Sequence, residues 1–76
     1  MGKTDYLGNR GDFYFHKTSE NEGGYNYYAF VNRSGKVYIM REEISTGNCL
    51  YADGRYSLDN AWTNRVSLDY DYINKI

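Results

Sequence analysis

Residues 25–43 constrain the fold of this chain more than any other stretch, because side chains alternate there with a period of two. The alternating residues are mostly Tyr, Val, Ile and Phe, and they lie on either side of a short polar segment at residues 32–35. This pattern predicts two antiparallel strands joined by a tight turn. Gly35 suits the positive φ that such a turn requires, since it has no Cβ. We therefore expect a β-hairpin at the centre of the fold.

Weaker signals on both sides of this hairpin predict the remaining elements. Alternating aromatic residues predict a strand, Asp-Gly pairs favour tight turns, and apolar residues spaced by three and four favour a helix. Together they indicate a mostly β fold, with four or five antiparallel strands in a small sheet or partial barrel and one short helix. The expected elements are strands at residues 12–17, 49–52 and 66–72, a loop at 18–24, and a helix at 59–65 capped by Ser57 or Asp59.

The chain has 76 residues, which corresponds to one domain close to the lower size limit for an independent hydrophobic core. Chains of this size often need a disulfide, a metal or a partner, but Cys49 is the only cysteine and His16 the only histidine. We therefore expect the fold to be stabilised by a partner protein rather than by a disulfide or a bound metal. The polar, glycine-containing residues 1–11 predict a flexible N-terminal arm, and residues 12–76 a single small β domain.

The ten tyrosines suggest how the chain meets its partner. Alternation assigns one set of side chains to a core and leaves a second aromatic set on the other side of the sheet. Because we expect 76 residues to be too few to cover two apolar faces, this second face predicts an interface. The predicted core is Phe15, Ala29, Val31, Val37, Ile39, Leu50, Trp62, Val66 and Leu68. The predicted interface is Tyr28, Phe30, Tyr38, Met40 and Tyr51, with Arg41 supplying polarity at its rim.

Trp62 and Arg65 lie on one side of the predicted helix, where they are expected to anchor it on the sheet. The alternative for Trp62 is an exposed ring in a binding groove.

No group of residues predicts catalysis. A nucleophilic Cys49 would need His16 as its base, and nothing near either residue suggests activation. Asp69 and Asp71 would share one face of the predicted last strand, where they could act as paired carboxylates or bind a hard cation. Solvation, or pairing with basic side chains across the sheet, is the favoured interpretation. We therefore predict no enzyme activity, no metal site and no cofactor.

Charge and hydropathy narrow the choice of partners. The net charge of −1 and the pI of about 5.7 argue against a dedicated nucleic-acid binder. No apolar run approaches the roughly 20 residues that a membrane-spanning helix needs, and no secretory signal is recognisable. We expect a soluble protein made in a cytoplasm, with no membrane or nucleic-acid partner.

The segment VYIMREE, followed by LYADG, AWTNR and VSLDY, resembles a pattern in short phage-encoded proteins. The resemblance spans roughly residues 27–73 and brings no established activity or active site. It implies a virus of bacteria as the source and a gene near those of the virion structure. The matching residues are Gly35, Tyr38, Ile39, Met40, Arg41, Glu42, Tyr51, Ala52, Gly54, Ala61, Trp62, Arg65, Leu68, Tyr70 and Tyr72.

The function expected from these observations is that of a bacteriophage virion protein. It would be a small subunit or adaptor that decorates capsid, neck, tail or fibre through its Tyr-rich sheet face. The expected partners are copies of itself, as a homo-oligomer, and larger virion structural proteins. The alternative is a monomeric binding module for a host glycan or a host protein.

Overall fold

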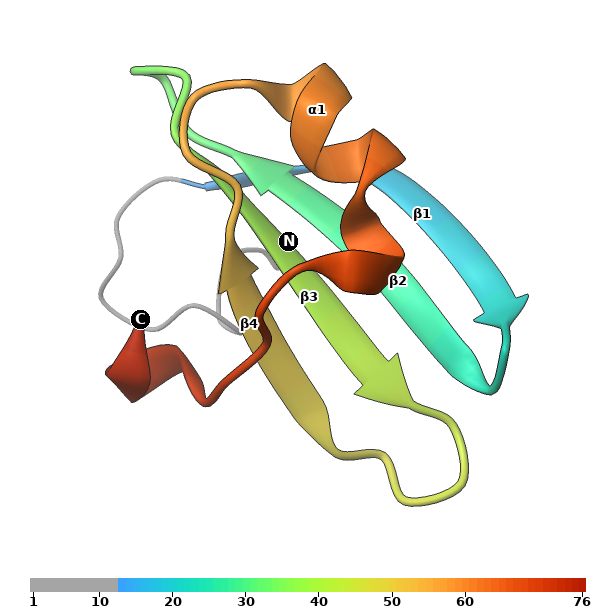
Figure 1. Ribbon diagram of the computed structural model, residues 1–76. Helices are drawn as coiled ribbons and strands as arrows, with labels where there is room; N and C mark the ends of the chain where they lie inside the picture. Colours follow the sequence, from blue (N-terminus) through green and yellow to red (C-terminus); the bar gives the residue numbers. More distant parts are fainter. Residues whose placement is uncertain (1–12) are drawn as a thin grey trace.

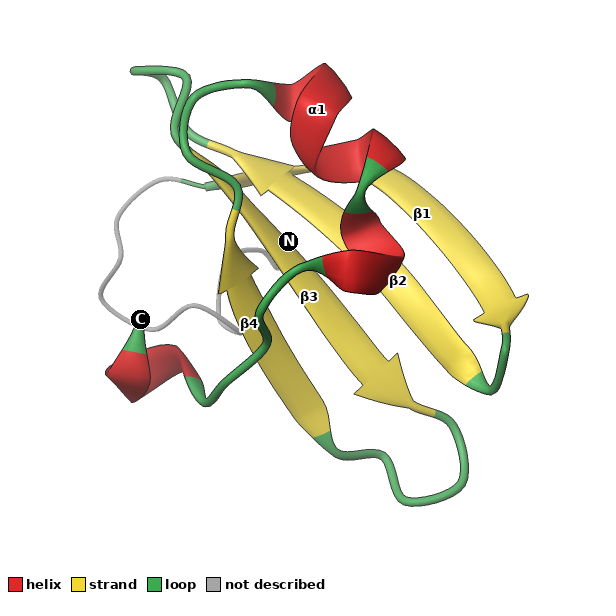
Figure 2. Cartoon of the chain, in the orientation of Figure 1, coloured by secondary structure: helices red, strands yellow, loops and turns green. Residues whose placement is uncertain are grey.

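The computed structural model describes residues 13–76, which form one four-stranded antiparallel sheet with helical turns packed on it (Figures 1 and 2). The strands lie in chain order, β1-β2-β3-β4, so the sheet is a simple meander. The predicted mostly β fold is therefore confirmed, as an open sheet. Its elements are β1 (Tyr14–Glu22), β2 (Tyr25–Val31), β3 (Val37–Glu43), β4 (Cys49–Asp53), α1 (Leu58–Thr63) and the 3-10 turns η2 (Arg65–Ser67) and η3 (Ile73–Lys75).

The central hairpin, β2 and β3, forms as the alternation predicts. Its register is regular from Tyr25↔Glu43 to Val31↔Val37. In the connecting turn, the Asn32 Oδ1 atom accepts hydrogen bonds from the backbone N–H groups of residues 34 and 36, at 3.0 and 2.9 Å. Gly35 has a φ of 90°, a conformation that a side chain would disfavour. Turn and strands thus specify the same register, which fixes the side of the sheet on which each side chain lies.

One side of the sheet, here called the helix face, is covered by α1 and the residues after it (Figure 1). Ser57 caps α1, because its side chain accepts a hydrogen bond from the Asn60 N–H. The close approach of α1 to β3 depends on Gly54, where an added Cβ would lie 2.8 Å from Val37 Cγ1 and 2.9 Å from the Ala61 Cβ. The buried residues of the helix face are Tyr27, Ala29, Val37, Ile39 and Ala61.

The other side of the sheet, here called the opposite face, is also covered by the chain itself. Its buried residues are Phe13, Phe30, Tyr38, Met40 and Tyr51, and Ile73 and Ile76 from the C-terminal segment pack against them. The Phe13 ring meets the Tyr38 ring edge-on, with centroids 5.0 Å apart. The prediction that 76 residues cannot cover two apolar faces is therefore wrong. A few large residues from outside the sheet cover the second face.

Strand β1 is longer than predicted and places its aromatic residues differently. It continues to Glu22 through most of the segment expected to be a loop, because polar residues such as Thr18 and Ser19 pair with β2. Phe15, a predicted core residue, is 58% exposed, whereas Phe13 just before the strand is 2% exposed. An edge strand lies beyond the area that the covering segments reach. Alternation predicts that Phe13 and Phe15 lie on the same side of the sheet. It does not predict which of them the covering residues reach.

The predicted strand at residues 66–72 does not form. Residues 65–67 make the 3-10 turn η2, and only Asp71 pairs with the sheet, through two backbone hydrogen bonds to Tyr51 of 2.7 and 2.9 Å. Leu68 and Tyr70 still pack on the helix face, so their alternation reflects contact with the sheet rather than membership of it. Val66, predicted as core, is 61% exposed.

The other predictions for the core fall into two groups. Ala29, Val37 and Ile39 are fully buried, as predicted. Val31, Leu50, Trp62 and Leu68 are only half-buried. The predicted flexible arm at residues 1–11 lies outside the residues that the structure describes.

The burial of Tyr38 leads to a direct test of the face assignment. Tyr38→Ser should lower the free energy of unfolding by about 3 kcal/mol, because it removes a ring from a packed core. Chemical denaturation followed by circular dichroism measures the change. The matched control is Tyr56→Ser, since Tyr56 is 69% exposed and its loss should cost less than about 0.5 kcal/mol. Equal stability of the two variants would contradict burial of the opposite face.

Candidate functional site

The predicted interface does not form an exposed surface in the folded chain. Four of its six residues have exposed fractions between 3% and 6%, and they are core residues of the opposite face. The expectation that they are exposed is wrong for a physical reason: the C-terminal turn η3 and Phe13 occupy the surface that a partner would need. The buried four are Phe30, Tyr38, Met40 and Tyr51, while Tyr28 and Arg41 are half-buried.

Arg41 lies on the helix face, between two aromatic rings. Its guanidinium carbon is 4.7 Å from the centroid of the Tyr25 ring and 4.5 Å from that of Tyr70. Such stacking stabilises a cation while its charge stays partly hydrated. The Tyr70 hydroxyl donates a 2.6 Å hydrogen bond to the Arg65 carbonyl, and burial raises the pKa of Tyr70. Arg41 therefore holds two tyrosines together instead of lying at a rim.

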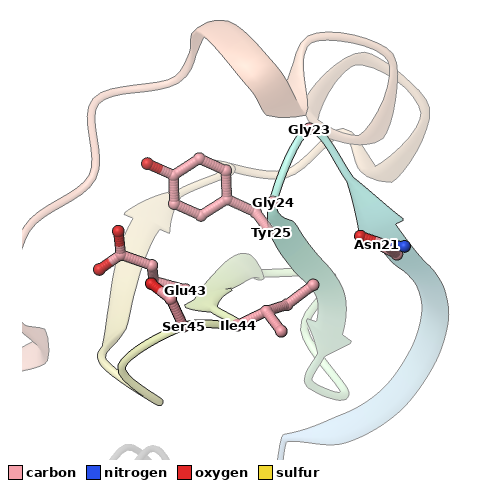
Figure 3. Close-up of a pocket in the computed structure, with 7 residues that line it drawn as sticks. All are labelled: Asn21, Gly23, Gly24, Tyr25, Glu43, Ile44 and Ser45. Carbon is pink, nitrogen blue, oxygen red and sulfur yellow. The ribbon is translucent and has the colours of Figure 1, made fainter.

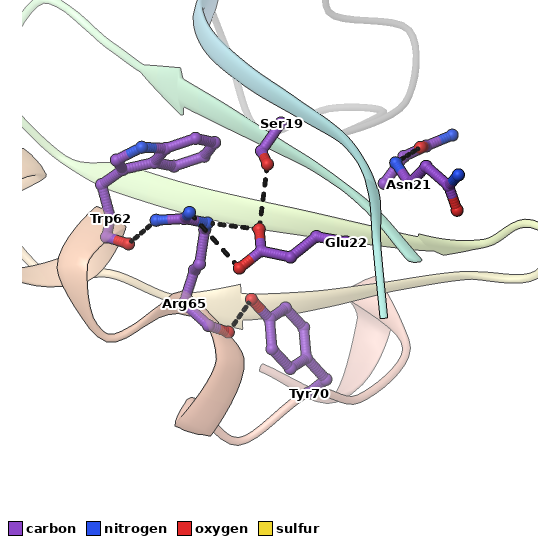
Figure 4. A network of polar contacts seen from close by, with 7 residues as sticks. Ser19, Asn21, Glu22, Trp62, Arg65 and Tyr70 are labelled. Atoms are coloured by element: carbon purple, nitrogen blue, oxygen red, sulfur yellow. Dashed lines mark hydrogen bonds and ion pairs between the residues drawn. The ribbon is translucent and has the colours of Figure 1, made fainter. Parts of the chain in front are cut away.

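Arg65 connects the end of the helical segment to β1 (Figure 4). It donates from Nε to Glu22 Oε1 at 3.0 Å and from Nη1 to the Trp62 carbonyl at 2.7 Å. Its guanidinium also lies 4.5 Å from the centroid of the Trp62 ring. Ser19 donates a 2.9 Å hydrogen bond to the same Glu22 oxygen. The predicted anchors, Trp62 and Arg65, are thus brought together, with Glu22 as the partner that sequence reasoning missed.

This network changes the protonation of Glu22. Hydrogen bonds from Ser19 and Arg65 hold the pKa of Glu22 below its usual value of 4.5. Because the pKa is lowered in the folded state, the ionised carboxylate stabilises the fold above about pH 4.5. That contribution is lost as the pH falls through the folded-state pKa.

The residues with catalytic potential lie apart from one another. His16 is exposed on β1, and Cys49 lies on β4. Burial and the nearby Glu42 carboxylate raise the pKa of the Cys49 thiol, which is the opposite of activation. Asp69 and Asp71 do not share a strand face as predicted, because that strand is absent. Within residues 13–76, no three His, Cys, Asp or Glu side chains come together to hold a metal ion.

The two edges of the sheet differ. The β4 edge is occupied at its middle residue, where Tyr51 pairs with Asp71. The β1 edge has no neighbouring strand among residues 13–76. Tyr14 and Phe15 lie at the start of β1 with exposed fractions of 51% and 58%. They pair with Val31 and Phe30, so their rings lie on the two different faces of the sheet.

A hollow of about 330 Å³, here called the turn hollow, lies at the other end of β1 (Figure 3). It opens between the β1–β2 turn and the first residues of the β3–β4 loop. An aromatic ring, an aliphatic side chain and several polar groups line it. The lining residues are Asn21, Gly23, Gly24, Tyr25, Glu43, Ile44 and Ser45. Sequence reasoning missed this hollow, because its lining comes from two turns about twenty residues apart in the chain.

Comparison with known proteins identifies no relative. No family model, no curated protein and no solved structure matches the chain. No helix within residues 13–76 is long and apolar enough to cross a membrane.

The Glu22–Arg65 contact predicts a specific pH dependence of stability. Glu22→Gln should reduce the loss of stability on acidification from about pH 5 to pH 3, because the variant has no carboxylate to protonate there. Denaturation curves at a series of pH values measure this slope. Glu20→Gln makes the same charge change at an exposed position of β1 and should keep the slope of the unmodified chain. Identical slopes for the two variants would contradict a role for Glu22.

Proposed function

We propose that this protein is a small, non-enzymatic virion component of a bacteriophage, which assembles through the edge of β1 with copies of itself or with a larger structural protein. The observation that carries the proposal is the β1 edge, which has no neighbouring strand among residues 13–76, together with its two exposed aromatic rings. Such an edge offers backbone N–H and C=O groups for a further strand, and the rings add apolar area beside them. The proposed contact residues are Tyr14 and Phe15.

The details of β1 favour a selective contact over general aggregation. Lys17 and two register shifts against β2, between residues 15 and 17 and between residues 19 and 22, interrupt the strand. Charged residues and bulges are features by which natural edge strands avoid indiscriminate pairing. The regular part that remains is short, so the adjoining rings would supply much of the binding energy. A partner must therefore fit both the strand and the rings.

The virion context has separate support. It comes from the resemblance of residues 27–73 to short phage-encoded proteins. The absence of an enzyme activity is part of the same proposal. Its support is the separation of His16 from Cys49 and the raised pKa of the thiol.

Light scattering across a concentration series tests the assembly. The unmodified chain should form a discrete oligomer. Phe15→Ser should raise the dissociation constant about tenfold or more, because a half-exposed aromatic ring at a contact is a strong candidate for a hot spot. The matched control is Tyr56→Ser, which removes an aromatic ring of similar exposure, 69%, from the segment that follows β4 on the other side of the sheet from β1.

Circular dichroism must show intact β-structure in both variants for the comparison to hold. A chain that stays monomeric at the highest concentration would contradict self-assembly. Equal weakening by Phe15→Ser and Tyr56→Ser would contradict the β1 edge as the contact. Mass spectrometry of purified phage particles then tests the virion location, and absence of the protein from the particles would contradict it.

A further inference from the structure

The turn hollow is lined by apolar side chains and by two glycines that add no side chain to it. Tyr25 and Ile44 supply an aromatic and an aliphatic wall (Figure 3). Gly23 and Gly24 have φ values of 61° and 90°, and a Cβ added at either would meet no atom within 4 Å. The backbone conformation of the turn thus excludes most side chains and leaves the space open. The volume of about 330 Å³ lies at the lower end of the range for small-ligand sites.

The aromatic wall is held in place before any ligand arrives. The Arg41 guanidinium lies 4.7 Å from the Tyr25 ring and is backed by the Tyr70 ring at 4.5 Å. Backbone hydrogen bonding also fixes the two turns relative to each other, since the Ile44 N–H donates to the Gly24 carbonyl at 3.1 Å. A site whose walls are already ordered pays less conformational entropy on binding.

Polar groups lie on both sides of these walls. Figure 3 shows Glu43 and Ser45 on one side of Ile44 and Asn21 on the other. The Glu43 Oε1 atom accepts a 2.9 Å hydrogen bond from the Thr46 hydroxyl, which orients the carboxylate. The carboxylate accepts, the amide both donates and accepts, and so does the hydroxyl. The hollow therefore offers mixed hydrogen-bonding groups around a small apolar surface.

This combination discriminates between classes of ligand. A wholly apolar ligand would make no hydrogen bond with the Glu43 carboxylate or the Asn21 amide. The Arg41 guanidinium lies against the Tyr25 ring and the Glu43 carboxylate lines the same hollow, so these opposite charges offset each other and favour a ligand without net charge. A sugar ring has C–H groups that can pack on Tyr25 and Ile44 and hydroxyls that can both donate and accept. Its size also suits a shallow site of this volume.

We propose that the turn hollow binds a neutral sugar unit of a glycan, between Tyr25 and Ile44, with its hydroxyls directed to Glu43, Ser45 and Asn21. This inference is independent of the proposed assembly, because the hollow lies at the end of β1 remote from Tyr14 and Phe15. Assembly can still be measured for a variant that does not bind sugar, and sugar binding for a variant that does not assemble.

NMR titration of the ¹⁵N-labelled full chain tests the proposal, with D-glucose, D-galactose and N-acetyl-D-glucosamine added separately. At least one sugar should shift the amide signals of Gly24, Tyr25, Ile44 and Ser45, with a dissociation constant on the order of 1 mM. Ile44→Ala should raise that constant about tenfold, because it removes one apolar wall at an exposed position. Tyr25→Phe should change it less than about twofold, since the ring remains.

The control is Val66→Ala, which shortens an exposed aliphatic side chain outside the hollow and should leave the dissociation constant unchanged. Three results would overturn the proposal. They are the absence of shifts with all three sugars, shifts that map away from the turn hollow, and binding that Ile44→Ala and Val66→Ala affect equally.

Discussion

Burial of β3 on both of its sides is the constraint on which the rest of the structure depends. Four consecutive residues of this strand, Val37 to Met40, have exposed fractions of 6% or less, so the sheet needs a covering layer on each face. With so short a chain, each layer consists of a few residues. On the helix face these come from α1 and the segment after it, and on the opposite face from Phe13 and the C-terminal isoleucines. The need to cover both faces of β3 explains why the helical segment, Phe13 and the C-terminal isoleucines pack on the sheet.

Polar contacts then fix the helical segment in position. Arg65 contacts Glu22 on β1 while stacking on Trp62, and Arg41 joins two tyrosines on the same face. A guanidinium suits such positions, because its flat faces stack on rings while its edges donate hydrogen bonds. The helix face is therefore held by directional contacts as well as by apolar packing. This explains why a helix of only six residues has a defined place on the sheet.

The sequence predicts this fold where the information is local. Alternation and turn chemistry predict the β2–β3 hairpin and β4. The capping residues predict a helix start near Ser57 or Asp59, and the structure selects Ser57. Alternation alone does not tell a buried aromatic face from an exposed one, because Tyr38 and Met40 have the same spacing in either case. What decides is whether residues such as Phe13 and Ile73, distant in sequence, return to cover them. The turn hollow and the Glu22–Arg65 contact depend in the same way on residues far apart in the chain.

The pairing of Asp71 with Tyr51 affects which edge strands of the sheet can pair with another molecule. With Tyr51 of β4 paired to Asp71, β1 is the edge strand that has no further pairing among residues 13–76. Two copies that join through that edge consume it on both sides, so growth by strand pairing ends with a closed, two-fold symmetric pair. An open fibre would also need the β4 edge, where Asp71 already occupies the backbone groups of Tyr51. If copies join by strand pairing, as proposed, this contact favours a finite pair over a growing fibre.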